Sequence, residues 1–245
     1  MALSIIIPAL NEAVALPDTL ASVQALEPEP KEVILVDGGS SDETVEIAKN
    51  FGATVLKSEC ANRALQMNLG AEAAQGDALC FLHADTRVPL DFVSLARAVL
   101  SDERTVLAGF VSLMTGPQKT RWFTSAHNFL KTYYAPILFR PISFLRGGRL
   151  LFGDQVLICR ADDFRAINGF DPDQKIMEEA DFCLRMARAG RGRTRQVHRI
   201  VRSSDRRVAE WGGLRANLKF IQIGVAWGLG RSAETLAEGY EDIRS

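Results

Sequence analysis

Several acidic residues of this sequence directly follow apolar runs, where a carboxylate could bind a cation or accept a proton. Asp85 follows the apolar run 78–82, and His83 lies two positions before it. Hard cations such as Mg²⁺ and Mn²⁺ prefer oxygen ligands and can bridge a diphosphate. We therefore predict that Asp85 is a ligand of a divalent cation, with His83 as a second candidate. A plain polar loop is the alternative for so short a motif.

The acidic run 178–181 could support a second kind of chemistry. It places Glu178, Glu179 and Asp181 at the predicted start of a helix. Carboxylates near a helix N-terminus are stabilised by the helix dipole by about 0.3–1 kcal/mol each, so they could be simple charged caps. One of them could instead be a general base that faces a substrate hydroxyl. The residues alone leave both interpretations open.

Two further polar segments follow apolar runs near the N-terminus. Residues 8–12 form a polar turn after the run 5–7, where Asn11 could simply cap a helix. Asp37 ends the next run and is followed by two glycines, which allow a ligand to approach the backbone closely. A glycine-rich turn with helix caps is the alternative for this second segment.

The elements that would position these residues alternate between strand and helix patterns. Strands are predicted at 3–7, 32–36, 53–56, 78–82, 105–113 and 156–159, and helices at 16–26, 61–74, 121–134 and 178–189. Ser40 and Glu43 have capping-box spacing before a further helix that ends at Asn50. Residues 136–148 resemble a loop, and residues 208–228 one long amphipathic segment.

This alternation predicts an α/β fold with a mixed, mainly parallel sheet that is flanked by helices. Ligands of such sheets bind at the carboxyl ends of the strands. The polar segments after residues 7, 36 and 82 should therefore meet at one edge of the sheet.

Composition and charge exclude some classes of function. The formal net charge is −1, so there is no global electrostatic case for nucleic-acid binding. The four cysteines are far apart and form no CxxC pair, which predicts reduced thiols. The N-terminus lacks a signal-peptide pattern, and the late apolar run 221–229 is too short to span a bilayer. The predicted location is the cytoplasm, with contact to the inner membrane surface left open.

The order and spacing of the polar segments resemble the family-2 glycosyltransferases, which have the GT-A fold. The dinucleotide fingerprint GxGxxG and the P-loop pattern GxxxxGK[ST] are both absent. The resemblance is carried by residues 6–12, 36–44, 63–70, the acidic turn at Asp85 and the run 178–185. The turn 153–155 looks like that of a small soluble bacterial subgroup.

The resemblance implies a metal-dependent, inverting transfer of a sugar from a nucleoside-diphosphate sugar to an acceptor hydroxyl. It implies that Glu179 is the catalytic base and that Asp85 holds Mn²⁺ or Mg²⁺. The donor would be bound by residues of the first half of the chain: Pro8, Ala9, Asn11, Glu12, Asp37, Gly38 and Arg63. Asp154 and Gln155 would flank the acceptor.

The same resemblance implies one catalytic domain over residues 1–230. Residues 1–115 would form its nucleotide-sugar-binding half, residues 116–230 its acceptor-side half, and residues 231–245 a C-terminal helical tail. Two features depart from the family pattern. The usual DxD motif is His83-Ala84-Asp85 here, and the QxxRW motif of processive polysaccharide synthases is missing, which disfavours a polymerising synthase.

Arginines are concentrated in residues 185–207, where Asp205 is the single acid. Part of this stretch is interpreted as the solvated face of a helix. Arg206 and Arg207 are predicted to contact diphosphate oxygens or an anionic acceptor. A membrane-surface patch is a third interpretation.

Two other classes of function compete with a glycosyltransferase. A catalytically weak nucleotide-sugar-binding protein would keep Asp37 and Arg63 but would not use Glu179 for chemistry. A nucleotidyltransferase would share the α/β layers and the metal. It would need a basic, glycine-rich loop after the first strand, and residues 8–12 contain no basic residue.

Overall fold

An eight-stranded sheet forms the centre of the computed structural model, which describes residues 1–117 and 119–238. The strand order is β3-β2-β1-β4-β7-β6-β8-β5. Neighbours are parallel within β3-β2-β1-β4 and between β6 and β8, and antiparallel where β7 or β5 takes part. The predicted α/β fold with a mixed, mainly parallel sheet is confirmed. The strands are β1 (Leu3–Ala9), β2 (Glu32–Asp37), β3 (Thr54–Lys57), β4 (Ala78–Phe81), β5 (Thr86–Arg87), β6 (Thr105–Thr115), β7 (Leu157–Arg160) and β8 (Arg193–Ser204).

Helices cover both faces of this sheet because its central strands are apolar on both sides. In β1, Leu3, Ile5 and Ile7 pack into one core with helices α1 and α4, while Ile6 packs into a second core on the opposite face with α3, α7 and α8. The helices are α1 (Leu16–Gln24), α2 (Thr44–Asn50), α3 (Arg63–Ala73), α4 (Phe92–Leu100), α5 (Trp122–Phe139), α6 (Pro141–Leu145), α7 (Ala161–Ala166), α8 (Glu178–Arg188), α9 (Arg206–Trp211), α10 (Gly213–Gly228) and α11 (Ala233–Glu238).

The second core contains a tight group of aromatic rings. Phe81, Phe164, Phe170 and Phe182 are mutual neighbours, with the rings of Phe170 and Phe182 stacked at 4.4 Å. These rings join β4 to α7 and α8. They therefore fix the start of α8, which carries the acidic run, against the sheet.

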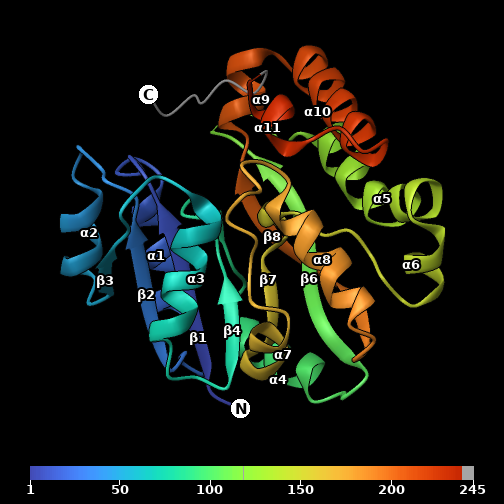
Figure 1. The fold of residues 1–245 in the computed structure, drawn as a ribbon. Coiled ribbons are helices and arrows are strands. Elements are labelled where there is room, and N and C mark those ends of the chain that lie inside the picture. Colours follow the sequence, from blue (N-terminus) through green and yellow to red (C-terminus); the bar gives the residue numbers. More distant parts are fainter. Residues whose placement is uncertain (118, 239–245) are drawn as a thin grey trace.

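The last helices lie beyond the carboxyl ends of the central strands. Figure 1 shows α9, α10 and α11 at the top of the molecule, with α5 directly below α10. Because the strand ends open toward these helices, the helices cover the edge of the sheet where ligands of α/β sheets bind.

The region after residue 135 differs from its sequence-based interpretation. Helix α5 continues through Pro136 to Phe139, where a loop was expected. Proline lacks an N–H, which leaves the carbonyl four residues earlier without its helical partner. Here the carbonyl of Thr132 accepts instead from the backbone N–H of Leu150, so the helix loses little. The expected long segment 208–228 is two helices, broken at Gly212, whose φ is +80°.

Most of the arginine-rich stretch is the strand β8, and its helical parts are residues 185–188 at the end of α8, where Arg188 is exposed, and residues 206–207 at the start of α9. The polar residues Thr194, Gln196 and Ser203 of β8 are buried between exposed arginines. Buried and exposed positions therefore alternate along this strand, but polar residues occupy most of the buried positions, so the usual alternation of apolar and polar residues is missing. Helix α4 was also not expected from the sequence. The predicted capping box at Ser40 and Glu43 is wrong: α2 begins at Thr44, and the Ser40 hydroxyl accepts from the backbone N–H of Asn11.

Three further expectations have outcomes in the described residues. All four cysteines are free, as expected, with Cys60 exposed and the others buried. Within the predicted tail 231–245, residues 233–238 are helical and residues 239–245 lie outside the described part of the chain. No helix between residues 1 and 238, leaving Gln118 aside, is long and apolar enough to cross a membrane.

Candidate active site

A cavity of about 520 Å³ opens at the carboxyl ends of β1 and β4, below α9 and α10. Both halves of the chain contribute to its wall. Ten of the residues predicted for the site line it: Pro8, Ala9, Glu12, Arg63, His83, Asp85, Asp154, Glu179, Arg206 and Arg207. Four others, Asn11, Asp37, Gly38 and Gln155, are not part of its lining.

Gln66, which the sequence did not reveal as a site residue, stabilises the part of the cavity formed by the ends of β1 and β2. Its buried side-chain amide donates to the carbonyl of Ala9 at 2.9 Å and to that of Val36 at 2.8 Å. It therefore joins the ends of β1 and β2. Gly38 packs against this amide so closely that a Cβ there would lie 3.1 Å from Nε2 of Gln66.

Asp37 and Asn11 shape the loops behind this part of the cavity. The Asp37 carboxylate accepts from the backbone N–H groups of Gly39 and Ser40, at 3.1 and 3.0 Å. Asn11 has a φ of +51°, and its side-chain oxygen accepts from the backbone N–H of Ser41 at 2.9 Å. In this structure both residues hold turns together, and the expected contacts of their side chains with a nucleotide remain a prediction.

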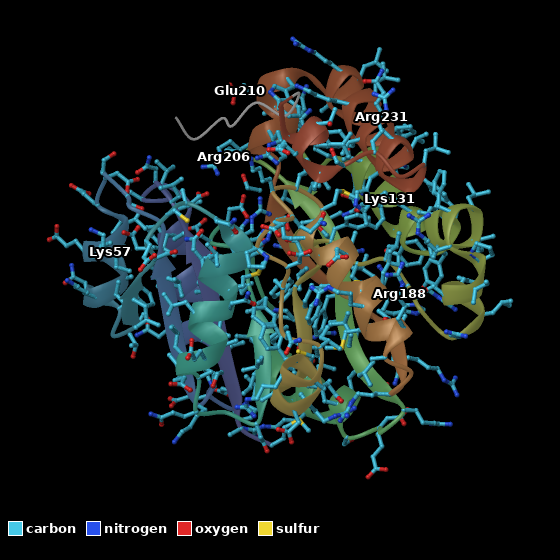
Figure 2. The ribbon with its side chains drawn as sticks, viewed as in Figure 1. Lys57, Lys131, Arg188, Arg206, Glu210 and Arg231 are labelled. Carbon is cyan, nitrogen blue, oxygen red and sulfur yellow. The ribbon has the colours of Figure 1, made fainter. Side chains whose placement is uncertain are left out.

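Glu12 links the N-terminal loop to the C-terminal helices. Its buried carboxylate accepts from Nη2 of Arg206 through both oxygens, at 3.0 and 3.1 Å. Arg206 thus contacts the loop after β1, and its predicted contact with a diphosphate or an anionic acceptor remains a prediction. Figure 2 shows Arg206 at the base of α9, on the side that faces the sheet.

The segment that carries Arg206 is anchored by its neighbour Asp205. The Asp205 carboxylate accepts from Nε of Arg121 at 2.6 Å, and its backbone N–H donates to the carbonyl of Thr115. Gly116 lies against the same carboxylate, and a Cβ at that position would overlap it. The start of α9 is therefore fixed against the end of β6.

Arg63 and the acidic start of α8 form the electrostatic centre of the cavity. Arg63 is the first residue of α3, where the side chain of Asn62 caps the helix by accepting from the backbone N–H of Leu65. Nε of Arg63 lies 3.1 Å from Oε1 of Glu178, and its Nη1 lies 3.4 Å from Oε1 of Glu179. Arg63 was expected to contact a diphosphate. In this structure its guanidinium group contacts these two carboxylates, and its contact with a diphosphate remains a prediction.

His83 approaches the same carboxylate from β4. Its Nε2 lies 3.3 Å from Oε1 of Glu179. Gly153 closes the space beside this pair, since a Cβ there would overlap both side chains. A glycine at the start of the turn 153–155 is therefore needed for the contact to form.

The two glutamates differ in acidity although both are buried. Burial raises the pKa of Glu178 to about 7, against the lowering effect of the Arg63 charge. Burial also acts to raise the pKa of Glu179, but the hydrogen bond with His83 and the Arg63 charge outweigh it and lower that pKa to about 2. The two values belong to an interacting pair, and the difference in direction follows from His83 contacting only Glu179. Glu179 is thus the carboxylate that stays ionised near neutral pH.

The far wall of the cavity contains a cation that the sequence did not reveal. The ammonium group of Lys131 lies 3.5 Å from the centre of the Phe152 ring. Burial lowers the Lys131 pKa to about 8, although the charges of Asp154 and Glu179 act in the opposite direction. Lys131 lies seven residues after Thr124 and three after Asn128 on one side of α5, so a polar stripe at helical spacing was the available signal.

The turn 153–155 divides between the cavity and the core. Asp154 lines the cavity and accepts from the side-chain amide of Asn128. Gln155 is fully buried: its side chain accepts from the backbone N–H of Phe152 and donates to the Thr132 hydroxyl. Asp154 is therefore available to a ligand, while Gln155 fixes the shape of the turn.

Asp85 places one carboxylate in the cavity at the end of β4. Its Oδ1 lies 3.4 Å from the hydroxyl of Thr86, and its carbonyl accepts from the backbone N–H of Ser204. Residues 1–117 and 119–238 contain no group of three or more His, Cys, Asp or Glu side chains that could hold a metal ion. Magnesium-type sites often use one or two carboxylates together with substrate phosphates. Asp85 fits such a site, whereas His83 is directed to Glu179.

Comparisons with known proteins agree with this geometry. Residues 4–160 match the family model described as glycosyl transferase family 2. A PGL/p-HBAD biosynthesis glycosyltransferase of Mycobacterium bovis is 29% identical over 226 residues, which cover 86% of this chain and 78% of the relative.

Solved structures share the fold at low sequence identity. A mannosyltransferase from Pyrobaculum calidifontis, in complex with GDP-Man and Mn²⁺, aligns with a TM-score of 0.68 and 17% identity over 98% of this chain and 65% of its own. S. aureus TarS aligns with a TM-score of 0.59 and 18% identity over 83% of this chain, which spans only 37% of that longer protein. The architecture is the GT-A fold that the polar motifs predicted. The chain belongs to glycosyl transferase family 2.

Proposed function

We propose that this glycosyltransferase moves a sugar from a nucleoside-diphosphate sugar to an acceptor hydroxyl with inversion at the anomeric carbon, and that Glu179 is the general base. The observation that carries the proposal is the ionised, buried carboxylate of Glu179 in the cavity, held by His83 and Arg63. A carboxylate with a low pKa is a weak base but is fully available near neutral pH.

In this mechanism Glu179 accepts a hydrogen bond from the acceptor hydroxyl. The hydroxyl oxygen forms a bond to the anomeric carbon as the bond from that carbon to the diphosphate oxygen breaks. The hydroxyl proton moves to Glu179. Attack from the face opposite the leaving group gives inversion, and the transition state has oxocarbenium character, as in glycoside hydrolysis.

The other residues position the reactants. Pro8, Ala9 and Glu12 line the donor side of the cavity, and Asp154 with Lys131 lines the far side, which we assign to the acceptor. Arg63 orients the two glutamates through its ion pairs with both. The assignment makes residues 1–115 the donor half and residues 116–230 the acceptor half of one catalytic domain.

We propose that Asp85 holds Mn²⁺ or Mg²⁺. A bound cation would neutralise charge that develops on the departing diphosphate. Two facts support this assignment: Asp85 lies in the cavity at the end of β4, and the Pyrobaculum mannosyltransferase was crystallised with Mn²⁺.

A ligand screen followed by a transfer assay tests the proposal. Melting temperature should rise with a nucleoside diphosphate or its sugar in the presence of Mn²⁺, because ligands that bind the native state stabilise it. EDTA and Asp85→Asn should each remove this rise. Asp77→Asn is the matched control, since Asp77 lies just before β4 at the opposite edge of the sheet.

Each outcome separates the alternatives. Equal donor affinity with Mn²⁺ and with EDTA would rule out the metal role while leaving Glu179 as base. Tight donor binding with no turnover of donor, across a panel of hydroxyl acceptors and water, would favour the nucleotide-sugar-binding protein.

A further inference from the structure

Large apolar side chains are exposed along α5, α6 and α10. Among residues 1–117 and 119–238, 18 large hydrophobic side chains are exposed, and 13 of them lie in the ranges 122–145 and 214–229. Trp122 is 70% exposed, Leu145 is 83% exposed and Leu214 is 78% exposed. Scattered exposed hydrophobic residues are normal on a protein surface, but a concentration of this size marks an interaction site.

On α5 three of these residues form one stripe. Phe123, Leu130 and Ile137 follow one another at a spacing of seven, so they share a helix face. Thr124 and Lys131 each come one position after a residue of this stripe, so they are turned about 100° away from it, and they line the cavity. Helix α5 therefore has one face in the active site and another, apolar face in solvent.

Helix α10 has the same two-sided character. Leu214, Leu218, Ile221 and Val225 follow spacings of four, three and four, which keeps them on one exposed face. Phe220 and Ile223, on other sides of the helix, line the cavity. The exposed stripe of α10 thus also lies on a wall of the active site.

The two helices lie side by side and run in the same direction. The side-chain amide of Asn217 donates to the Thr124 hydroxyl at 3.0 Å near their first turns. Near their ends, Nη1 of Arg140 donates to the carbonyl of Gly228 at 2.9 Å. Figure 1 shows α6 continuing from the end of α5. We call the exposed hydrophobic residues of this unit the apolar surface: Trp122, Phe123, Leu130, Tyr134, Ile137, Leu138, Ile142, Leu145, Leu214, Leu218, Ile221, Val225 and Leu229.

The net positive charge of the segments that carry the apolar surface indicates what kind of partner would bind there. The sequence has no Asp or Glu between Glu103 and Asp154, and none between Glu210 and Glu234. Exposed arginines accompany the apolar side chains at 146, 215 and 231. A second copy of this chain docked symmetrically on the apolar surface would bring cations against cations. An anionic lipid surface complements both the charge and the apolar stripes.

We propose that the apolar surface docks this protein on an anionic lipid bilayer. The apolar stripes of α5 and α10 enter the interface between headgroups and acyl chains, and Arg146, Arg215 and Arg231 contact anionic headgroups. Because the same two helices form walls of the active site, docking brings the cavity to the membrane surface. The inference does not depend on the reaction that the cavity performs.

Vesicle co-sedimentation of the full chain tests the proposal. The probes are vesicles of phosphatidylcholine alone and of phosphatidylcholine mixed with phosphatidylglycerol. The protein should sediment with the mixed vesicles much more than with the neutral ones, and added salt should weaken the association.

Two double variants separate the apolar and the charged contributions. Leu214→Ser with Leu218→Ser should weaken vesicle association by about tenfold or more, because each leucine loses its transfer into the interface. Arg215→Gln with Arg231→Gln should weaken association with mixed vesicles by roughly tenfold. Val14→Ser with Leu90→Ser is the matched control, since both positions are exposed and lie outside the apolar surface. Circular dichroism and donor-induced melting shifts check that each variant is folded.

Three results would overturn the proposal. The first is no association of the parent protein with either kind of vesicle. The second is equal association of the parent and both double variants. The third is a dimer in size-exclusion chromatography that the leucine variant dissociates while vesicle association stays unchanged, which would assign the apolar surface to a second copy of the chain.

Discussion

The Nε2 atom of His83 lies 3.3 Å from Oε1 of Glu179, although the two residues are 96 positions apart. In the DxD pattern an aspartate would stand at the position of His83. An aspartate there would place a second negative charge beside Glu179, whereas the imidazole stabilises the carboxylate. The departure from the DxD pattern therefore changes the charge beside Glu179.

His83→Ala should change the pH dependence of transfer. Losing the His83 hydrogen bond should raise the pKa of Glu179 from about 2, because that contact is the main effect that opposes burial. Protonated Glu179 cannot act as a base, so the rate at about pH 5 should fall several-fold relative to pH 8. The parent rate should have no such loss from Glu179. Single-turnover rates across this range measure the effect.

His127→Ala is the control for that variant. His127 lines the same cavity but contacts the hydroxyl of Tyr134 rather than Glu179. A pH profile of His83→Ala that matches the parent and the His127 variant would show that His83 does not tune the base.

Glu179→Gln should abolish transfer and leave donor affinity nearly intact. The substitution keeps the shape and removes the base, which typically contributes about 10²–10⁴-fold in rate. Glu178→Gln should be milder, because neighbouring positions on a helix point about 100° apart and cannot exchange roles. Single-turnover transfer and donor calorimetry measure the two effects. An inactive Glu178→Gln beside an active Glu179→Gln would move the base by one residue.

Glu178→Gln should also stabilise the fold, and more so at higher pH. The pKa of Glu178 is raised from 4.5 to about 7 in the folded protein. The folded state therefore binds more protons than the unfolded state between these values, and stability falls as pH rises through them. Glutamine does not titrate, so the variant should melt about 2–4 °C higher than the parent at pH 8, with a smaller difference near pH 5. Thermal melts at the two pH values measure this, and an equal shift at both would contradict it.

Lys131 should set a limit to activity on the alkaline side. Its pKa of about 8 means that the ammonium form is lost just above neutral pH. If the charge binds the acceptor or the leaving group, kcat/KM should fall as pH rises through 8. Lys131→Met should be roughly ten- to hundredfold slower and should lack this fall, because a charged hydrogen bond contributes about 1.5–3 kcal/mol. Lys131→Arg should move the fall to higher pH, and an unchanged profile in both variants would remove Lys131 from the site.

The sheet and most of the cavity could be predicted from the sequence because their signals are local. Apolar runs followed by polar turns predicted β1, β2 and β4 and the edge where Pro8, Arg63 and Asp85 meet. The parallel arrangement followed from alternating strands and helices. The start of α8 was also predictable, since Glu178 and Glu179 open an amphipathic helix.

The remaining features depend on partners distant in sequence. Gln66 has no distinguishing pattern, and only the fold shows that it joins two carbonyls from different strands. Strand β8 was hidden because three of its four buried side chains, those of Thr194, Gln196 and Ser203, are polar. Helix α5 continues through Pro136. The carbonyl of Thr132, which loses its helical partner there, accepts from the backbone N–H of Leu150, a contact that local sequence rules do not predict. Asp37 remains a predicted nucleotide ligand, and only the fold shows that its oxygens accept from the backbone of its own turn.

Gly116 shows how far a change outside the cavity can reach. It is not among the residues that line the cavity, but a single methyl group there would collide with the Asp205 carboxylate. The displaced carboxylate would release Arg121 and loosen the start of α9, where Arg206 holds Glu12. Mutational tolerance at position 116 should thus be as low as at the residues that bind substrate. A methyl group with no chemistry of its own would therefore disturb the loop after β1 that carries Glu12.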